Sequence, residues 1–248
     1  AMLVSALRAA GLDPSFVVGG ELVESRTNAS LADPELLVLE VDEAFGTFLP
    51  MRLSGLMVTN VEADHLDYYR TLDRLEGAFV EVVRAVEGPV VICSDDPGGR
   101  RLAERTGRTT YGLSEDADWR IDEIDMGDWS VRFTLSGRGC SYPVSVGRPG
   151  LYIAQDAGGA LALLGELGYD VALAATGLAS FSGVRRRFEV RATVGGVTII
   201  DDYAHHPTEI AATLAAARQG SWRRVWAVFQ PHRYSRTAEL HQEFGSSF

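Results

Sequence analysis

The chain has 248 residues, of which 46% are hydrophobic and 23% are charged. This length allows one large domain or two ordinary ones with a substantial core. No stretch approaches the ~18 consecutive apolar residues of a membrane span, and no basic start precedes an apolar signal core. The sequence therefore predicts neither membrane insertion nor secretion and favours a cytoplasmic protein. The two cysteines, Cys93 and Cys140, lie far apart and do not suggest a disulfide framework.

Charge is distributed unevenly along the chain, whose formal net charge is −11. Residues 1–130 hold 25 acidic and 11 basic residues, whereas residues 131–248 hold 9 acidic and 12 basic residues. The acidic balance argues against nucleic-acid binding by the whole chain, although the later part could receive a smaller anion. All 23 basic residues are arginine, so a phosphate site built from this chain must use guanidinium groups and backbone amides. Nothing in the sequence indicates an oligomeric state.

The first part of the chain alternates between helix and strand patterns. The spacing of apolar residues predicts helices over residues 2–13, 71–86, 98–107 and 154–170. Short, nearly continuous apolar runs predict strands over residues 15–20, 35–41, 53–61 and 88–96. Such runs are typical of a parallel sheet that is buried on both faces. Residues 118–146 change to a pattern of alternating strand residues and predict a β-rich hairpin insert in an otherwise open α/β fold.

A second unit is predicted to begin near residues 184–187, which gives a first domain at 1–186 and a second at 187–248. The second unit should contain a hairpin around Gly195 and Gly196, a strand after it, and a helix over 207–220. A further strand is predicted over 224–231, followed by the start of another helix. Both ends of the chain break off within helix-like stretches, so we expect a fragment of a longer protein.

Two groups of polar residues follow predicted strands, where open α/β sheets place their ligands. The first group contains Glu40, Asp42 and Glu43, and the second contains Asn60, Glu62, Asp64, His65 and Asp67. Oxygen ligands with one imidazole suit a hard divalent cation such as Mg²⁺ or Mn²⁺. Two alternatives stay open: acids solvated at a strand end, and acids that stabilise the dipole of a helix N-terminus.

A third polar group comes from the second unit. The stretch "IIDDYAHHPTEIAAT" at residues 199–213 contains adjacent histidines, and "FQPHRYSRT" adds a histidine and two arginines spaced by three. Guanidinium groups beside histidines indicate a clamp for phosphate or carboxylate. A capping or core role for His205 and His206 is the simple alternative. A metallohydrolase site built from His65, His205 and His206 is another, but it does not explain the arginine pair.

Four segments resemble the signature blocks of the Mur ligases: "TNVEADHLDYY", "RRRFEV", "DDYAHHPTEI" and "FQPHRYSRT". The likeness extends from residue 1 to residue 248, and the last two blocks resemble those of the members that add the first amino acid of the peptidoglycan stem. The resemblance implies a parallel-sheet central ATPase domain with a β-rich insert, followed by the start of a Rossmann-like C-terminal domain. It places a uridine-binding domain and a lysine-containing P-loop before residue 1.

The resemblance also implies an activity and its residues. An ATP-dependent ligase would join L-alanine to UDP-N-acetylmuramate through an acyl phosphate, with ATP and Mg²⁺ as cofactors. The implied Mg²⁺ ligands are Glu40 and His65. The implied ATP-side residues are Arg187 and Asp202, near the ribose and phosphates, and Tyr203, which lines the adenine pocket. The implied catalytic and substrate residues are His205, Arg233 and Arg236, with Asn28 facing the substrate.

Several positions depart from the family pattern. Tyr152 and Ile153 stand where members carry a His-Asn pair, and Asp156 stands where a further Asn is usual. Ala44 and Phe45 replace a serine and an aspartate. These changes favour an alternative function, a degenerate relative that binds a wall precursor or a partner ligase without catalysis. A sibling ligase that attaches a recycled peptide is a further alternative, which the intact "FQPHRYSRT" argues against.

Overall fold

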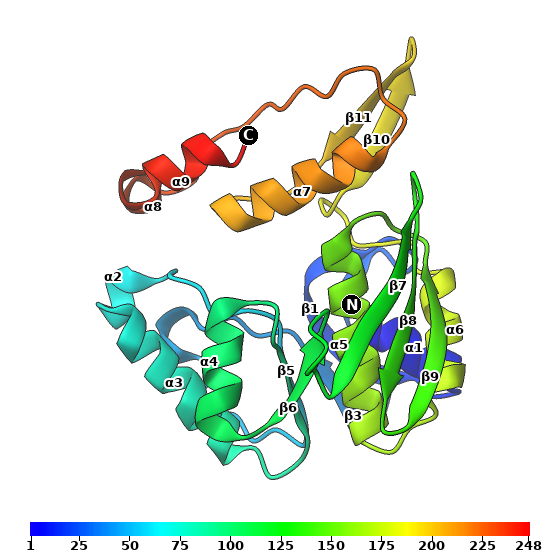
Figure 1. Cartoon of the computed structure of the whole chain (residues 1–248), viewed down its shortest axis with the longest axis vertical. Helices are drawn as coiled ribbons and strands as arrows, with labels where there is room; N and C mark the ends of the chain where they lie inside the picture. Colours follow the sequence, from blue (N-terminus) through cyan, green and yellow to red (C-terminus); the bar gives the residue numbers. More distant parts are fainter.

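The computed structural model describes residues 1–248 and is dominated by a six-stranded sheet (Figure 1). The strand order is β4-β5-β6-β7-β8-β9, parallel from β4 to β7 and antiparallel from β7 to β9. The six strands are β4 (Leu56–Val58), β5 (Val90–Cys93), β6 (Thr109–Gly112), β7 (Trp119–Met126), β8 (Val131–Gly137) and β9 (Cys140–Val146).

Strand β5 is covered by helices on both faces, as the predicted α/β fold requires. Val90 and Ile92 pack in a cluster with the helices α3 (Leu72–Ala85) and α4 (Pro97–Thr106). Val91 and Cys93 point the other way, into the main core that contains α5 (Leu151–Glu166). Because both faces of the strand are covered by helices, an uninterrupted apolar run is stable there. The fold is confirmed as α/β with a parallel sheet.

Helix α5 forms the centre of the main core. Its small residues, such as Ala154, Ala157 and Ala162, are fully buried and let neighbouring elements approach closely. The helices α1 (Met2–Ala9) and α6 (Val171–Ala179) pack against it and against each other. Helix α1 matches a prediction, whereas α6 was missed because its apolar residues surround the helix and give little amphipathic signal.

A separate three-stranded sheet has the order β2-β1-β3. Its strands are β1 (Pro14–Leu22), β2 (Thr27–Ser30) and β3 (Asp33–Leu39), with β1 and β3 parallel. Two of the predicted strands therefore lie here and do not pair with β4. After β3 the chain passes through the short helix η1 (Ala44–Gly46), and after β4 through α2 (Leu66–Tyr69). The carboxyl ends of β3 and β4 thus lead directly into the two acidic groups.

The predicted β-rich insert is confirmed as the meander β7–β8–β9, which extends the large sheet. Alternate residues of these strands, including Ile121, Phe133 and Leu135, are buried against the core. This one-sided burial is the pattern expected of antiparallel strands. The tip of the β7–β8 hairpin reaches toward the last part of the chain (Figure 1).

The last part of the chain begins with the hairpin β10 (Glu189–Val194) and β11 (Val197–Asp201). Gly195 and Gly196 both have positive φ, 59° and 78°, as a tight two-residue hairpin turn requires. The helix α7 (Pro207–Gln219) follows, and α8 (Tyr234–Glu239) and α9 (His241–Ser246) end the chain.

The strand predicted over 224–231 is wrong. This stretch is extended but unpaired, and Trp226 and Val228 are 81% and 101% exposed. An alternating or apolar pattern alone does not stabilise a strand, because the backbone N–H and C=O groups of the strand need a neighbouring strand as hydrogen-bond partner. Strand β6 was not predicted, because its sequence TTYG lacks the apolar run that marks β4 and β5. None of the helices has the length and apolar character needed to cross a membrane.

Candidate functional site

His65 lies beside two carboxylates at the end of β4. Its Nε2 atom is 3.7 Å from Asp64 Oδ2 and 3.8 Å from Glu43 Oε1, and all three side chains are mostly buried. Burial raises the pKa of Glu43, against the smaller opposing effects of its backbone hydrogen bond and of His65. His65 itself has a positive φ of 55°, a conformation that non-glycine residues adopt rarely and that often marks a functional position.

Glu40 does not lie in this group. It is exposed at the end of β3, where its N–H donates to Val17 O and its carboxylate lies against Gly19. The two acidic groups therefore meet through Glu43 and His65, and the sequence did not single out that pairing. No cluster of three or more His, Cys, Asp or Glu side chains has the spacing of a metal centre.

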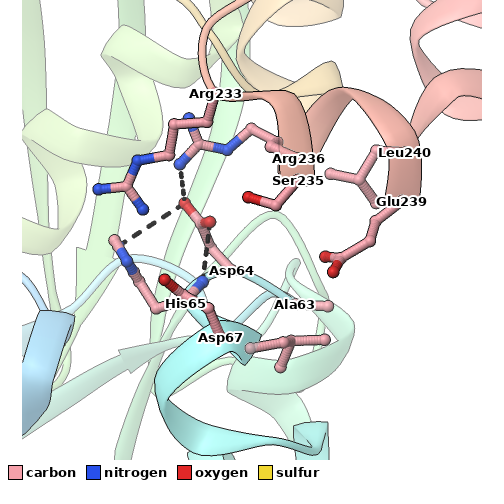
Figure 2. A pocket seen from close by; sticks show the side chains of 10 residues that line it. Ala63, Asp64, His65, Asp67, Arg233, Ser235, Arg236, Glu239 and Leu240 are labelled. Carbon is pink, nitrogen blue, oxygen red and sulfur yellow. Dashed lines mark hydrogen bonds and ion pairs between the residues drawn. The ribbon is translucent and has the colours of Figure 1, made fainter.

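Arg236 joins the last part of the chain to the end of β4. Its Nη2 atom donates to Asp64 Oδ2 at 2.6 Å, although Arg236 comes from α8 (Figure 2). Burial raises the pKa of Asp64, but the hydrogen bonds from Arg236 and the His65 backbone outweigh it, so the pKa is lowered. Only 5% of Arg236 is exposed, and its Nε and Nη1 atoms have no hydrogen-bond partner.

Arg233 lies next to Arg236 at a pocket lined from both sides. Figure 2 shows both guanidinium groups above Asp64 and His65, with Ser235 and Glu239 on the α8 side. Arg233 is exposed and has a positive φ of 65° where α8 begins. The two arginines, three residues apart in the sequence, thus line the same pocket. A buried guanidinium with unsatisfied donors beside an exposed one suits an anionic ligand.

A second ion pair joins the same two regions. His206 Nδ1 lies 3.1 Å from Glu62 Oε2, and both side chains are at least three-quarters buried. Burial lowers the pKa of His206, but the contact with Glu62 outweighs this and raises it. The same contact lowers the pKa of Glu62 against the opposing effect of burial. Glu62 and Asp64, which the sequence offered as metal ligands, thus pair with residues of the second unit.

The adjacent histidines have different surroundings. His205 faces the rings of Tyr203 and His232, with centroids 5.0 Å and 6.0 Å away, whereas His206 faces Glu62. Their backbone N–H groups both donate to Glu209 Oε2, which completes the N-terminus of α7. The backbone N–H groups of His205 and His206 thus take part in capping α7, as one alternative proposed. The two imidazole rings contact different partners. His65, His205 and His206 do not converge, which removes the geometric support for the metallohydrolase alternative.

The three predicted ATP-side residues lie together. The Cζ atom of Arg187 is 5.7 Å from the centroid of the Tyr203 ring, and Arg186 lies over the same ring at 4.6 Å. Asp202 accepts hydrogen bonds from the N–H groups of Phe188 and Ala204, both at 2.7 Å. Its carboxylate therefore orders the backbone around Tyr203, which is 41% exposed.

Asn28 is not brought to any of these groups. It is exposed in β2, whose only partner strand is β1, and its side chain makes no hydrogen bond within the chain. Its proposed contact with substrate has no geometric support within the described residues.

The positions that depart from the family pattern fall into two environments. Ile153 is 8% exposed and belongs to the main core, and Ala44 is buried as well. Phe45 is 65% exposed, has a positive φ of 56° and packs edge-on against Tyr68. Burial raises the pKa of Asp156 to about 6 despite the opposing charge of Arg187.

Comparison with known proteins identifies two regions of the chain. Residues 24–164 match the Mur ligase middle domain, and residues 186–248 match the glutamate ligase domain of Mur ligases. A UDP-N-acetylmuramate–L-alanine ligase from Myxococcus xanthus is 42% identical over 100% of this chain and 53% of its own length. One from Clavibacter michiganensis is 46% identical over 98% of this chain and 52% of its own length.

Solved structures agree with these matches. A UDP-N-acetylmuramate–alanine ligase from Thermotoga maritima superposes with a TM-score of 0.82 at 27% identity, over 96% of this chain and 55% of that one. A murein peptide ligase from Psychrobacter arcticus gives a TM-score of 0.65 at 26% identity, over 94% and 54%. The chain thus spans about half the length of the relatives that it matches.

Proposed function

Because the chain belongs to the Mur ligase family, we propose that the intact protein is an ATP-dependent ligase that joins L-alanine to UDP-N-acetylmuramate in peptidoglycan synthesis. Support for these substrates comes from relatives that carry this activity in their names at 42% and 46% identity. The sibling murein peptide ligase superposes less well, with a TM-score of 0.65 against 0.82 for the alanine-adding enzyme, at nearly the same identity of 26% against 27%.

The observation that carries the proposal is the buried guanidinium of Arg236. Two of its nitrogen atoms lack partners, and leaving buried donors unsatisfied costs about 1–3 kcal/mol or more for a charged group. A bound carboxylate or phosphate would remove that cost. Arg233, on the same helix start, offers a second fork to the same anion.

In the proposed reaction, a carboxylate oxygen of the muramoyl group attacks the γ-phosphorus of ATP, and ADP leaves. The amine of L-alanine then attacks the acyl carbon, loses a proton, and displaces inorganic phosphate. The two anions that meet in the first step repel each other, and phosphoryl transfer depends mostly on positioning and charge stabilisation. Arg233 and Arg236 supply this charge, and His205 positions the substrate beside them.

ATP would lie on the side of Arg187, Asp202 and Tyr203. An aromatic ring with an arginine over it suits an adenine base, and Arg187 suits the phosphates. His65 offers an imidazole beside the carboxylates of Glu43 and Asp64, but these three side chains do not have the spacing of a metal centre, and Asp64 is paired with Arg236. Glu40 lies apart from His65, so the proposal of Glu40 and His65 as Mg²⁺ ligands rests on the resemblance to the family. When bound, Mg²⁺ neutralises charge on the phosphates.

The proposal includes the organisation of the chain and its location. Residues 1–186 form the central ATPase domain, and residues 187–248 begin the C-terminal ligase domain. Support for this boundary comes from the junction at Arg186 and Phe188, where two positive φ values interrupt the regular backbone. A cytoplasmic location fits an enzyme that uses ATP.

The test is product formation by the intact protein. Phosphate release from ATP should require both UDP-N-acetylmuramate and L-alanine, and mass spectrometry should detect the sugar nucleotide extended by one alanine residue. Phosphate release that depends on a peptide instead of alanine would identify the sibling activity. A folded protein that binds the sugar nucleotide but releases no phosphate would support the degenerate relative and contradict the proposal.

A further inference from the structure

The junction between the two units is held in an unusual backbone conformation. Arg186 and Phe188 have φ values of 59° and 47°, on either side of Arg187. Residues with side chains reach this region only at a cost, so the surrounding structure must hold them there. The direction in which the Arg187 side chain leaves the backbone depends on both neighbours.

The second unit holds the junction through hydrogen bonds to its N–H and C=O groups. Phe188 N donates to Asp202 at 2.7 Å, and Tyr203 N donates to Arg186 O at 2.8 Å. The Phe188 side chain is 3% exposed and packs with Ala216 and Ala217. These contacts leave the carbonyl groups of Arg187 and Phe188 to be satisfied from elsewhere.

The first unit satisfies them through Arg148, which lies between β9 and α5. Its Nη2 atom donates to Arg187 O at 3.1 Å and also to Phe188 O. No carboxylate lies within ion-pairing distance of this guanidinium. Gly183, at a φ of 98°, leaves the room that the group needs, since a Cβ there would lie 3.0 Å from Arg148 Nε. Burial lowers the pKa of Arg148.

We propose that Arg148 is a positioning residue that clamps the junction and thereby directs the Arg187 guanidinium toward the nucleotide. A half-buried cation without a carboxylate partner is costly, and here its hydrogen bonds go to the carbonyls of two successive peptide units. Without the clamp, the strained junction can relax and Arg187 turns away from its place beside Tyr203. The inference rests on the proposed function, which places the nucleotide there.

The first arm of the test measures hydrogen exchange in the ligand-free protein. In Arg148→Met, the amides of Phe188 and Tyr203 should exchange at least about tenfold faster, because a charged donor to the adjacent carbonyls is lost. Arg148→Lys should give an intermediate rate, since an ammonium can still donate to one carbonyl. Arg108→Met is the matched control, because Arg108 Nη2 likewise donates to two carbonyls, Val83 O and Val86 O.

The second arm measures kinetics in the intact protein. Arg148→Met should raise KM for ATP about tenfold with a smaller change in kcat, and Arg187→Met should do at least the same. If Arg148 acts through Arg187, the double variant should be no worse than Arg187→Met alone, because coupled residues are not additive. If the increases in KM for ATP of the two single variants multiply in the double variant, the inference is wrong. It is also wrong if Arg148→Met leaves the hydrogen-exchange rates of Phe188 and Tyr203 unchanged. An unchanged KM for ATP in Arg187→Met would instead contradict the nucleotide assignment in the proposed function.

Discussion

At the scale of single residues, Arg236 links burial, charge and the proposed chemistry. Asp64 is its one hydrogen-bond partner within the chain. The other two nitrogen atoms have no partner, even though only 5% of the residue is exposed. The ion pair with Asp64 holds the guanidinium in place at the pocket, and Nε and Nη1 are buried donors that lack a hydrogen-bond partner. Arginine suits this double use because its donors lie in a rigid plane.

We expect Arg236→Lys to lower kcat/KM for the sugar nucleotide strongly. Lysine keeps the charge but loses the fork, and losing one such contact typically costs ~2–4 kcal/mol of transition-state stabilisation, or roughly a 10²–10³-fold loss in rate. Arg233→Lys should act in the same direction. The control is Arg132→Lys, because Arg132 is exposed and paired with Asp125 far from the site. A kcat/KM within about threefold of wild type would make Arg236 a purely structural residue.

The pair of His206 and Glu62 should make stability depend on pH. The folded-state pKa of His206 is raised, so its contribution is complete below the unfolded value near 6.5 and is lost as pH rises through the folded value. The pKa of Glu62 is lowered, so its contribution is lost as pH falls through that value. His206→Gln should therefore cost about 1 kcal/mol near pH 6 and less near pH 9, as measured by urea unfolding. An equal cost at both values would contradict the ion pair.

The proposed metal ligands can be tested by the Mg²⁺ dependence of activity. Glu40→Ala and His65→Ala should each raise the Mg²⁺ concentration for half-maximal activity by about tenfold or more, because each removes a ligand. Asp73→Asn is the control, since Asp73 is an exposed carboxylate in the first turn of α3 and does not line the pocket. If Glu40→Ala behaves like the control, the structure offers Glu43, which lies beside His65, as the carboxylate to examine.

At this scale the sequence predicted part of the site. The block that contains Asp202, Tyr203 and His205 and the block that contains Arg233 and Arg236 stand out by residue type, and the structure brings them together. The pairing of Glu62 with His206 and of Asp64 with Arg236 could not be predicted, because it joins residues 144 and 172 positions apart. The role of Arg148 could not be predicted from the sequence either, since a single arginine after a strand is usually an ordinary surface residue.

At the scale of elements, the tip of the β7–β8 hairpin contacts the second unit. Trp129 lies 5.5 Å from Trp222 and 6.5 Å from Phe188 between ring centroids, both in edge-on geometry. Asp128 accepts hydrogen bonds from Ser221 beside them. The hairpin belongs to the same unit and the same sheet as the strand that precedes Arg148, and it contacts the junction through Phe188.

We expect Trp129→Ala to weaken the attachment of the second unit. Aromatic pairs of this kind contribute roughly 0.5–1.5 kcal/mol each, so the free energy of unfolding should fall by about 1–2 kcal/mol in urea titrations followed by fluorescence. Trp226→Ala is the control, because Trp226 is 81% exposed and makes no contact with another aromatic ring. Equal losses in the two variants would mean that the hairpin contact does not stabilise the chain.

Local patterns predicted elements where tertiary contacts agree with them. The run 88–96 became β5, and the amphipathic run 71–86 became α3, because neighbours cover the faces that the patterns mark as apolar. The run 224–231 carries an equally clear strand pattern but has no partner strand and stays unpaired. The sequence pattern shows which side chains a strand would bury, but it does not show whether another strand lies beside it to form hydrogen bonds.

At the scale of the whole molecule, the proposed site lies where the two units meet. The first unit contributes Glu62, Asp64 and His65, and the second contributes His206 and Arg236. Charge follows the same division, since the acidic excess lies in residues 1–130 and the arginine-rich blocks lie later. A ligand bound between them would complete contacts that neither unit makes alone, which fits a reaction that must bring two anions together.

The central claim is that the protein forms an amide through an acyl phosphate, and oxygen transfer tests it most directly. UDP-N-acetylmuramate labelled with ¹⁸O in its carboxylate is supplied to the intact protein with ATP and L-alanine, and the released phosphate is analysed by mass spectrometry. Attack of the carboxylate on the γ-phosphorus carries one labelled oxygen into phosphate when the amine displaces it. We therefore expect one ¹⁸O atom per phosphate released. Unlabelled phosphate would contradict the account, because the oxygen that the carboxylate loses on forming the amide would then have left by another route.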